Sequence, residues 1–381
     1  MEDVKNSLKE NRDFHGNRDF YNLIKTATRE LIERKIELND NRKRILTEAG
    51  LHALDRNFSG LEGSNAKIKR IFKDLYEPNY DIKVDFDKPF SVLDAIKKNV
   101  MDSNTRYLML ISEGSDGRDI VKHLLNSKKK IYKELIGSKY KADIRSGEYS
   151  EEILNKIKYI METDSILILK DLDMIYPSLY DLFNQNFTVM GEKKFARIAF
   201  EYAKISSEVN KDFHVIVLVN KNQIQNLKLD PPFLNNFEKH IINFDMILED
   251  KDIEIARKNV NYIELIATFN NNPNLKIDLE KLLINCRLHN IEGLIFKIKN
   301  DIKNNINKEN NEDNEWINKE GIEYEENLIK EVFKKIVPTF CQDIIVSMMN
   351  SGIKAKNYND MVLNIYKNSN YYNFVSFFQK Y

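Results

Sequence analysis

The spacing of apolar residues divides the chain into three regions, and the first, residues 1–77, has the pattern of helices. One apolar stripe recurs every three or four positions at Phe20, Leu23, Ile24, Ala27 and Leu31. The same spacing returns at Ile68, Ile71, Phe72 and Leu75. Such spacing is typical of the apolar face of an amphipathic helix. A turn-rich break with two glycines, residues 56–63, separates the two stripes. The first region is therefore predicted to be helical.

The second region, residues 78–250, contains short continuous apolar runs instead. They lie at residues 107–112, 165–169 and 214–219, as expected of strands buried on both faces of a sheet. Helical segments are predicted at residues 120–125, 149–162 and 179–183. Strands that alternate with helices indicate a parallel α/β sheet with right-handed crossovers. Ligands of such sheets bind at the carboxyl ends of the strands.

The third region, residues 251–381, returns to helical spacing. One helix is predicted to begin at residues 252–257, and a later one carries Leu328, Ile329, Val332, Phe333 and Ile336. Between them, residues 300–314 are rich in Asn, Lys and Glu and nearly free of apolar residues, which predicts a disordered insertion.

Composition limits the classes of function. The chain has 381 residues with 59 basic and 59 acidic side chains, so its net charge gives no reason to expect binding to nucleic acid or an anionic membrane. Its two cysteines, Cys286 and Cys341, exclude a disulfide framework and a Cys-rich zinc module. The N-terminus is polar, and no apolar run approaches the roughly 18 residues of a membrane span. We expect a cytoplasmic protein with no membrane span and no metal site.

The first predicted strand is followed by a loop, residues 113–119, where a phosphate-binding P-loop would lie. A P-loop has the pattern Gly-x-x-x-x-Gly-Lys-Ser/Thr, whereas this loop reads Glu-Gly-Ser-Asp-Gly-Arg-Asp and lacks the lysine. Glu113, Asp116 and Asp119 face a single arginine, Arg118. Each like charge near a phosphate costs roughly 4 kcal/mol at an effective dielectric of about 20, and a micromolar complex is worth only about 8 kcal/mol. The loop is interpreted as an unoccupied turn into a helix.

Polar residues also follow the other two strands. Asp171 or Asp173 stands where a Walker B motif places an acid for Mg²⁺, but Leu172 occupies the position next to Asp171 and cannot activate water. Asn220 ends the third strand, where a polar residue can sense a γ-phosphate. Asp171, Asp173 and Asn220 are therefore the candidate nucleotide ligands. The alternatives are an ordinary acid after an apolar strand and an asparagine that opens a turn.

The most distinctive string in the chain covers residues 230–240, Asp-Pro-Pro-Phe-Leu-Asn-Asn-Phe-Glu-Lys-His. Pro231 and Pro232 suit the first turn of a helix, and Phe233, Leu234 and Phe237 would form its apolar face. The string also contains Asn235, Glu238, Lys239 and His240. His240 is interpreted as a helix-end or packed histidine without a catalytic role.

This string and several others resemble mysterin, the family of giant AAA+ ATPases and RING-type ubiquitin ligases. The further matching strings are residues 106–110, 137–140, 161–162 and 176–187, together with 12–25 and 56–61. The resemblance covers roughly residues 10–250. It implies that residues 1–77 are the helical lid of a preceding AAA+ module, residues 78–250 a degenerate AAA+ core without a standard P-loop, and residues 251–381 a C-terminal helical lid.

The resemblance also implies roles for single residues and partners. Arg18 would be the lid arginine that faces nucleotide in the preceding module. Asn236 stands where the family has an arginine, and it has no charge to stabilise a phosphoryl transition state. ATP and Mg²⁺ are cofactors of the parent family, but none is expected in this module. Its partners would be neighbouring AAA+ modules, and the ubiquitin machinery only through a full-length family member, because two cysteines and six histidines do not form a RING-type zinc pair.

Three hypotheses about function follow. The first is a non-catalytic AAA+ segment that serves as a structural module of a mysterin-like motor and ligase. The second is a Mg-nucleotide-binding ATPase module with an altered P-loop. The third is a free-standing adaptor unrelated to motors. A fragment, a split gene and a shortened paralogue all agree with the sequence.

Overall fold

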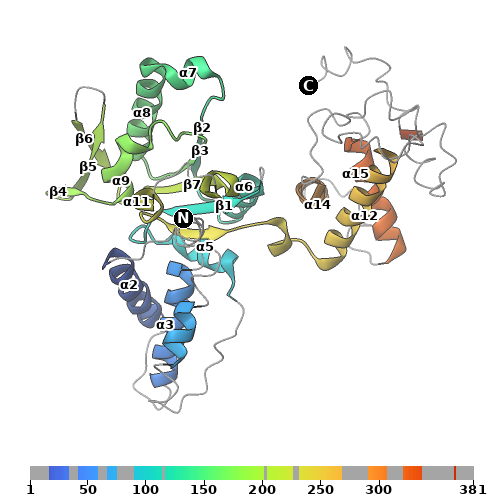
Figure 1. Cartoon of the computed structure of the whole chain (residues 1–381), viewed down its shortest axis with the longest axis horizontal. Coiled ribbons are helices and arrows are strands. Elements are labelled where there is room, and N and C mark those ends of the chain that lie inside the picture. The colour runs from blue at the N-terminus through green and yellow to red at the C-terminus, as the bar shows by residue number, and fades with distance from the viewer. Residues whose placement is uncertain are drawn as a thin grey trace, which may run out of the picture. The chain divides into compact units, whose positions relative to one another are not determined.

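The computed structural model contains two compact units, Met1–Asn243 and Phe244–Tyr381, whose elements are labelled in Figure 1. It describes residues 17–33, 42–58, 67–74, 90–113, 116–200, 204–225, 231–267, 291–306, 321–336 and 364–365. The structural statements below concern these residues.

A five-stranded parallel sheet forms the centre of the first unit (Figure 1). Its strands in chain order are β1 (Leu108–Ser112), β2 (Tyr132–Ile136), β3 (Ile166–Lys170), β7 (His214–Asn220) and β8 (Glu238–Ile241). Their order across the sheet is β2-β3-β7-β1-β8, and each neighbouring pair is parallel. The three apolar runs are β1, β3 and β7, the central strands, and their residues are almost all buried. The prediction of a parallel α/β sheet is confirmed.

The two edge strands, β2 and β8, were not predicted. Half-buried and exposed residues alternate irregularly along β2, so it lacks a continuous apolar run. In β8, the buried residues are Glu238, Lys239 and His240, which no apolar pattern could indicate. The helix predicted over residues 231–240 is therefore wrong beyond its first turn. The helix α11 covers only Pro231–Leu234, and the string then enters the sheet.

Helices and a small second sheet surround the central sheet. The helices are α5 (Val92–Met101), α6 (Asp116–Ser127), α7 (Lys141–Arg145), α8 (Gly147–Met161), η1 (Tyr176–Leu179), α9 (Tyr180–Phe183) and α10 (Lys221–Gln225). The segments predicted to be helical at residues 120–125 and 179–183 fall within α6 and within η1 and α9, and the segment at 149–162 matches α8 except for its last residue. Between β3 and β7, the strands β4 (Thr188–Met190), β5 (Lys193–Ala199) and β6 (Lys204–Val209) form an antiparallel sheet that the sequence pattern did not indicate.

The helix α8 illustrates how the sequence sets these elements. The Ser146 side chain accepts a hydrogen bond from the backbone N–H of Tyr149 at 3.4 Å and caps the helix. The buried residues of α8 repeat with helical spacing at Ile153, Leu154, Ile157, Ile160 and Met161. They join the core that lies on β1, β3 and β7.

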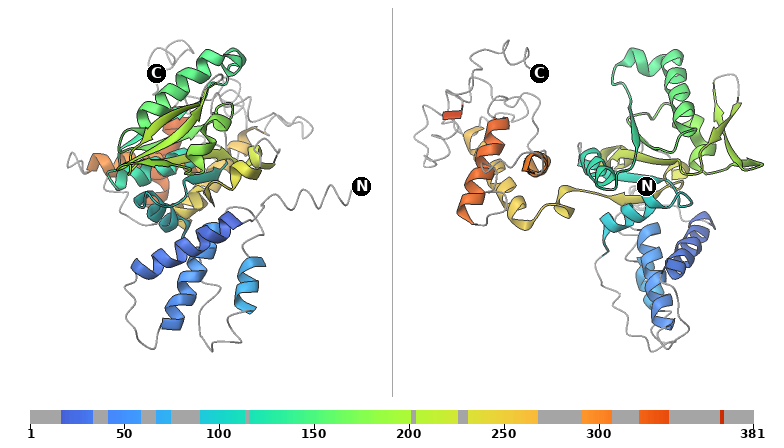
Figure 2. Two further views of the ribbon diagram at one scale, coloured as in Figure 1. Left: turned by 90° about the vertical axis from the view of Figure 1, so that its left-hand side faces the viewer. Right: turned by 180° about the vertical axis from the view of Figure 1, so that it is seen from behind.

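Two long helices, α2 (Asn17–Glu33) and α3 (Arg42–Phe58), pack on each other and belong to the first unit. The helix α3 contacts β8, and Figure 2 shows the pair on this side of the sheet in both views. Residues 67–74 form a further helix. The described part of residues 1–77 is thus largely helical, as predicted. The predicted apolar face of α2 is corrected, however, because Leu23 packs on the α3 cluster of Leu51, Leu54 and Phe58, whereas Phe20 and Ile24 are exposed.

The second unit contains the helices α12 (Asp250–Ala267), α14 (Ile291–Ile306) and α15 (Ile322–Ile336). A buried Asp252 carboxylate joins them, because it accepts hydrogen bonds from the Lys299 ammonium at 2.6 Å and from the Tyr324 hydroxyl. Burial, followed by the bond to Asp252, raises the pKa of Tyr324. The predicted disordered insertion is wrong for residues 300–306, which continue α14 and bury Ile302. Residues 307–314 lie outside the described residues. None of the described helices is long and apolar enough to cross a bilayer.

Candidate functional site

The loop after β1 is the position at which an AAA+ fold would hold the nucleotide phosphates. Strand β1 ends at Ser112, and α6 begins at Asp116, so the connection is much shorter than a P-loop. The hydroxyl of Ser112 accepts a hydrogen bond from the backbone N–H of Gly117 at 3.2 Å. A Cβ atom at Gly117 would lie only 2.8 Å from this hydroxyl oxygen. The glycine therefore allows the chain to bind its own helix N-terminus, where a P-loop would bind phosphate.

The arginine of this loop is paired within the fold. Arg118 donates through Nε and Nη2 to the two carboxylate oxygens of Glu134 on β2, at 2.6 and 2.9 Å. Lys122 reaches the same carboxylate at 2.6 Å. The hydrogen bonds from Arg118, assisted by Lys122, lower the pKa of Glu134 to about 2 despite its partial burial. Both cations near the start of α6 are thus held against β2.

The candidate Walker B residue Asp171 has an unusual backbone. Its φ is 56°, in the left-handed region, where Asp is one of the better-tolerated residues. Gly137, which follows β2, donates its N–H to the carbonyl of Lys170 at 2.8 Å. A Cβ atom at Gly137 would lie 1.7 Å from the carbonyl oxygen of Asp171. Leu172 is completely buried in the core. The loops after β2 and β3 therefore interlock through a position that only glycine can fill.

The other two candidate ligands are connected through one glutamine. Gln223 donates to the carboxylate of Asp173 at 3.2 Å, and its side-chain oxygen accepts from the backbone N–H of Asn220 at 2.9 Å. The side-chain oxygen of Asn220 accepts from the N–H of Asn222 at 2.9 Å. This bond is typical of an asparagine that opens a turn, which was the alternative to a γ-phosphate sensor at Asn220. The structure brings Asp173 and Asn220 together, as the strand ends require, and shows both in local hydrogen bonds.

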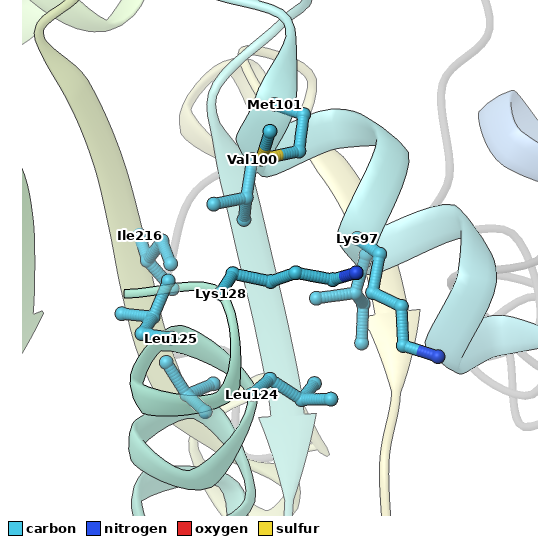
Figure 3. Close-up of a pocket in the computed structure, with 9 residues that line it drawn as sticks. Lys97, Val100, Met101, Leu124, Leu125, Lys128 and Ile216 are labelled. Atoms are coloured by element: carbon cyan, nitrogen blue, oxygen red, sulfur yellow. The ribbon is translucent and has the colours of Figure 1, made fainter. Parts of the chain in front are cut away.

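A small apolar pocket lies at the opposite end of α6 (Figure 3). Its lining residues come from α5, α6 and β7 and include Val100, Met101, Leu124, Leu125 and Ile216. The pocket volume is about 10 Å³, which accommodates roughly one water molecule. It is much too small for a nucleotide.

The two distinctive strings at residues 176–187 and 231–240 pack on each other through their aromatic rings. Tyr176 stacks on Phe233 with ring centroids 4.8 Å apart. Phe183 and Phe237 each contact Phe233, and they lie 5.1 Å from one another. Leu234 is buried in the same core, whereas Pro232 is exposed. The strings thus form one aromatic cluster beside β1.

Beyond this cluster, the string supplies a buried carboxylate, Glu238 on β8. Arg56 of α3 donates to both of its oxygens at 2.8 Å. Asn99 donates to one oxygen at 2.8 Å, and the His240 ring nitrogen Nε2 lies 3.0 Å from the other. Burial raises the pKa of Glu238, but the bond from His240 and the charge of Arg56 outweigh it and hold this pKa at about 2. The carboxylate is ionised and fully paired.

A second arginine extends the network to α2. Arg106, which precedes β1, donates to Asp19 at 2.9 Å and to the side-chain oxygen of Asn57. It also approaches the carbonyl of Asn235 at 3.4 Å. All of these side chains except that of Asn235 are buried. We call the complete network the polar junction, and its members are Asp19, Arg56, Asn57, Asn99, Arg106, His214, Glu238 and His240.

His214, the first residue of β7, belongs to the polar junction through Asn99. Its Nε2 lies 2.8 Å from the side-chain oxygen of Asn99, so Nε2 carries the proton because Asn99 uses its amide group to donate to Glu238. Burial lowers the pKa of His214 to about 4. The histidine is therefore neutral in the folded protein at pH 7.

Three of the remaining candidate residues are buried within the fold. His240 is completely buried in a strand, and its ring lies 5.8 Å from that of Phe90. Lys239 is also buried and donates to the carbonyl of Leu234 at 3.3 Å. Asn236, the position of the family arginine, is buried. Arg18 lies in the first turn of α2, and its side chain is outside the described residues.

Sequence reasoning found the Pro231–His240 string but missed its partners Arg56, Asn99 and His214. Asn99 and His214 stood in no matched string, and Arg56 belonged to one that gave no indication of its partner. Within the described ranges, no group of three or more His, Cys, Asp or Glu residues is arranged to hold a metal ion.

Comparison with known proteins agrees with this geometry. The parallel sheet with flanking helices has an AAA+-like fold, and residues 97–248 match the family model described as the RNF213 AAA domain. The chain is 27% identical over 254 residues to the E3 ubiquitin-protein ligase RNF213 of Mus musculus, covering 63% of this chain. It is 24% identical over 270 residues to the protein of that name from Homo sapiens, covering 67% of this chain. It is 26% identical over 239 residues to rnf213-beta of Danio rerio, covering 60% of this chain.

These matches define the class of the module. The class is an AAA+ module, and residues 97–248 are similar to the AAA domain of the mysterin (RNF213) family. The aligned segment spans only about 5% of the length of the mouse and human relatives.

The close approach of Gly137 to Asp171 predicts the effect of a single methyl group. Gly137→Ala places a Cβ atom 1.7 Å from a backbone oxygen, so the two loops must separate, at a cost of about 3 kcal/mol or more. Gly191→Ala is the matched control, because Gly191 has φ of 62° but nothing within 4 Å of the added atom. It should cost only about 1–2 kcal/mol. Urea unfolding of both variants measures the difference, and equal losses would contradict the interlocked loops.

The pairing of Arg56 with Glu238 predicts a non-additive double substitution. Arg56→Met leaves a buried carboxylate without its main counter-charge and should lower the free energy of unfolding by about 3–5 kcal/mol. Adding Glu238→Gln removes the stranded charge and still accepts from His240, so the double variant should be more stable than the sum of the single losses predicts. Denaturant unfolding of the four proteins completes the cycle. Additive losses would show that the two side chains are not coupled.

The low pKa of His214 predicts that stability falls in mild acid. Its pKa is about 4 in the folded protein against the ordinary 6.5 of a histidine, so below pH 6.5 the unfolded chain takes up a proton that the folded protein does not. This group alone should lower the free energy of unfolding by about 2 kcal/mol between pH 7.5 and 5. His214→Gln should remove that part of the pH slope, whereas His123→Gln, at an exposed position of α6, should retain it. An unchanged slope in His214→Gln would contradict the assignment.

Proposed function

We propose that this chain is a non-catalytic AAA+ segment that serves as a structural module of a longer mysterin-like ATPase and ubiquitin ligase. The observation that carries the proposal is the bond between the Ser112 hydroxyl and the backbone N–H of Gly117. It occupies the start of α6, the helix that would have to offer its amides to phosphate. A nucleotide could bind there only after this contact was broken and the loop rebuilt.

Three further features support the proposal. Arg118 and Lys122 are held on Glu134, so their positive charges are already balanced. Leu172 fills the core where an ATPase of this type carries a glutamate that activates water. Asn220 caps its own turn. Each of these side chains has a local structural role in place of a chemical one.

The polar junction supports the structural part of the proposal. It fixes α2 and α3, which precede the AAA-domain match at residues 97–248, to the sheet that forms the centre of that match. In the proposed arrangement residues 1–77 are the lid of a preceding AAA+ module, with Arg18 facing its nucleotide, and residues 251–381 are the following lid. The module would then transmit the position of one neighbour to the other.

The wider biochemical setting is part of the same proposal. ATP and Mg²⁺ would be bound by other modules of the parent protein and not by this one. The direct partners would be neighbouring AAA+ modules, and ubiquitin transfer would involve this chain only through a full-length ligase such as those whose name the relatives carry. The compartment expected for this module is the cytoplasm.

A second candidate function is a Mg-nucleotide-binding module with an altered P-loop. One observation favours it: Gln223 draws Asp173 and Asn220 together at the carboxyl edge of the sheet, near Asp171. These side chains are the oxygen ligands that Mg²⁺ prefers. In this arrangement the phosphates would be held without a P-loop lysine.

Titration of the purified chain with labelled ATP and Mg²⁺ separates the two functions. We expect no saturable binding in the micromolar range, because like charges at the loop cost roughly 4 kcal/mol each. Asp171→Ala is the informative variant and Asp143→Ala, on α7, is its control. Saturable micromolar binding that Asp171→Ala abolishes and Asp143→Ala leaves intact would overturn the proposed function in favour of the second candidate.

A further inference from the structure

Lysines surround the small apolar pocket at the C-terminal end of α6. Apart from Lys97 and Lys128, every residue that lines this pocket is apolar. The Lys128 side chain extends across the pocket toward Lys97 (Figure 3). From Lys128 the chain continues directly into Lys129 and Lys130. We call the cavity together with these four lysines the lysine-rimmed pocket.

Most of the positive charge at the lysine-rimmed pocket has no counter-charge. Lys97 pairs with Asp94 of its own helix at 3.1 Å. In the part of the chain that the structure describes, Lys128, Lys129 and Lys130 form no ion pair. The first two are exposed, and Lys130 is half-buried. Three like charges in succession repel one another, so this rim favours a ligand that carries negative charge.

The backbone of Lys129 supplies a second, independent observation. Its φ is 52°, in the left-handed region. This position closes α6, because the N–H of Lys128 donates to the carbonyl of Leu124 at 3.2 Å and the N–H of Lys130 donates to that of Leu125 at 3.0 Å. Glycine fills such a position at least cost, and a lysine beside it would serve the helix dipole equally well. Lys129 therefore stands where stability favours glycine, and strain of this kind is concentrated at functional sites.

The size of the cavity limits the class of ligand. Its volume is about 10 Å³, whereas pockets for small molecules measure roughly 300–1,000 Å³, so a fatty acyl chain or a cofactor does not fit. A membrane surface requires a broad apolar face, but Met101, at 58%, is the one exposed apolar residue of the lining. The tip of a single apolar side chain needs far less space, and the flexible Met101 can move aside for it.

We infer that the lysine-rimmed pocket binds an acidic peptide segment of a partner protein through one apolar anchor residue. The anchor enters the cavity, and acidic residues on either side of it pair with Lys128, Lys129 and Lys130. Exposed ion pairs are individually weak and are screened by salt, so the complex is transient and needs the anchor. This function goes beyond the proposed structural role and does not depend on it, because the pocket lies at the opposite end of α6 from the candidate nucleotide site.

The first experiment pans a library of short random peptides on the full chain and measures the enriched peptides by fluorescence anisotropy. The enriched sequences should carry an apolar residue flanked by Asp or Glu. Replacing their acidic residues by Asn and Gln, or their apolar residue by Ser, should raise Kd about tenfold or more, because either the charge pairs or the anchor is lost. Enrichment of neutral or basic sequences alone, or no enrichment, would overturn the inference.

A triple substitution locates the site of binding. Lys128→Gln with Lys129→Gln and Lys130→Gln should raise the Kd of an enriched peptide about tenfold or more. The control removes the same number of positive charges from exposed positions at and before α7, namely Lys139→Gln, Lys141→Gln and Arg145→Gln. It should keep Kd within about twofold. Equal losses in both variants would show that the peptide responds only to the charge of the whole chain, against the inference.

Substitution by glycine separates binding from stability. Lys129→Gly should raise the urea midpoint, because glycine adopts a φ of 52° without strain, and should still weaken peptide binding. Lys130→Gly is the control, because Lys130 has no positive φ, so glycine there should lower the midpoint. A lower midpoint for Lys129→Gly would show that this lysine stabilises the fold and would overturn the inference.

Sedimentation with lipid vesicles tests a membrane as the alternative partner. The probes are vesicles of phosphatidylcholine with and without about 30% phosphatidylserine. The full chain should remain in the supernatant with both, because the pocket offers no broad apolar face. Sedimentation with the anionic vesicles that the triple substitution at residues 128–130 abolishes would overturn the inference in favour of a membrane surface.

Discussion

The carboxylate of Glu238 is the constraint on which the first unit depends. It lies in the edge strand β8 with its side chain buried, and a buried unpaired charge costs several kcal/mol. Strand β8 can therefore join the sheet only when Arg56, Asn99 and His240 surround it. Because Arg56 is on α3, the docking of that helix and the completion of the sheet become one event. Hydrophobic packing alone would allow the helix to slide along the sheet edge, and the bidentate pair fixes its place.

Pairing within the fold also determines the state of the candidate nucleotide site. Nucleotide binding requires amides, a cation and carboxylates that remain available until the ligand arrives. At the carboxyl edge of this sheet Ser112, Arg118 and Asn220 have partners from their own fold. An AAA+ motor converts nucleotide occupancy into movement. In the proposed structural module these bonds would hold the corresponding loops in place without a nucleotide.

The central part of the fold was predictable from the sequence, because β1, β3 and β7 are buried on both faces and leave continuous apolar runs. The edge strands β2 and β8 were not predictable. Strand β2 is only half-buried, and β8 buries charged and polar side chains through their pairing, so neither contains a continuous apolar run. Residues 300–306 were predicted to be disordered because they contain few apolar residues. Ile302 is nevertheless enough to pack this end of α14. At the site, the strand ends indicated Asp171, Asp173 and Asn220 as candidate ligands, and that role stays a prediction. The polar junction could not be read from the sequence, since Arg56 and Glu238 lie 182 residues apart and no local pattern connects them.

The α2 helix shows how pairing of this kind determines which side of a helix is buried. A helix with one apolar and one polar side ordinarily buries the apolar side, because each exposed large apolar residue forfeits roughly 1.5–3 kcal/mol of burial. Here the buried ion pairs of Asp19 and Glu30 fix a rotation in which Leu23 packs on α3 while Phe20 and Ile24 are exposed. Reversing it would strand Arg106 and Lys98 and expose charges that now neutralise one another. The ion pairs of Asp19 and Glu30 therefore set the rotation of α2, even though Phe20 and Ile24 stay exposed.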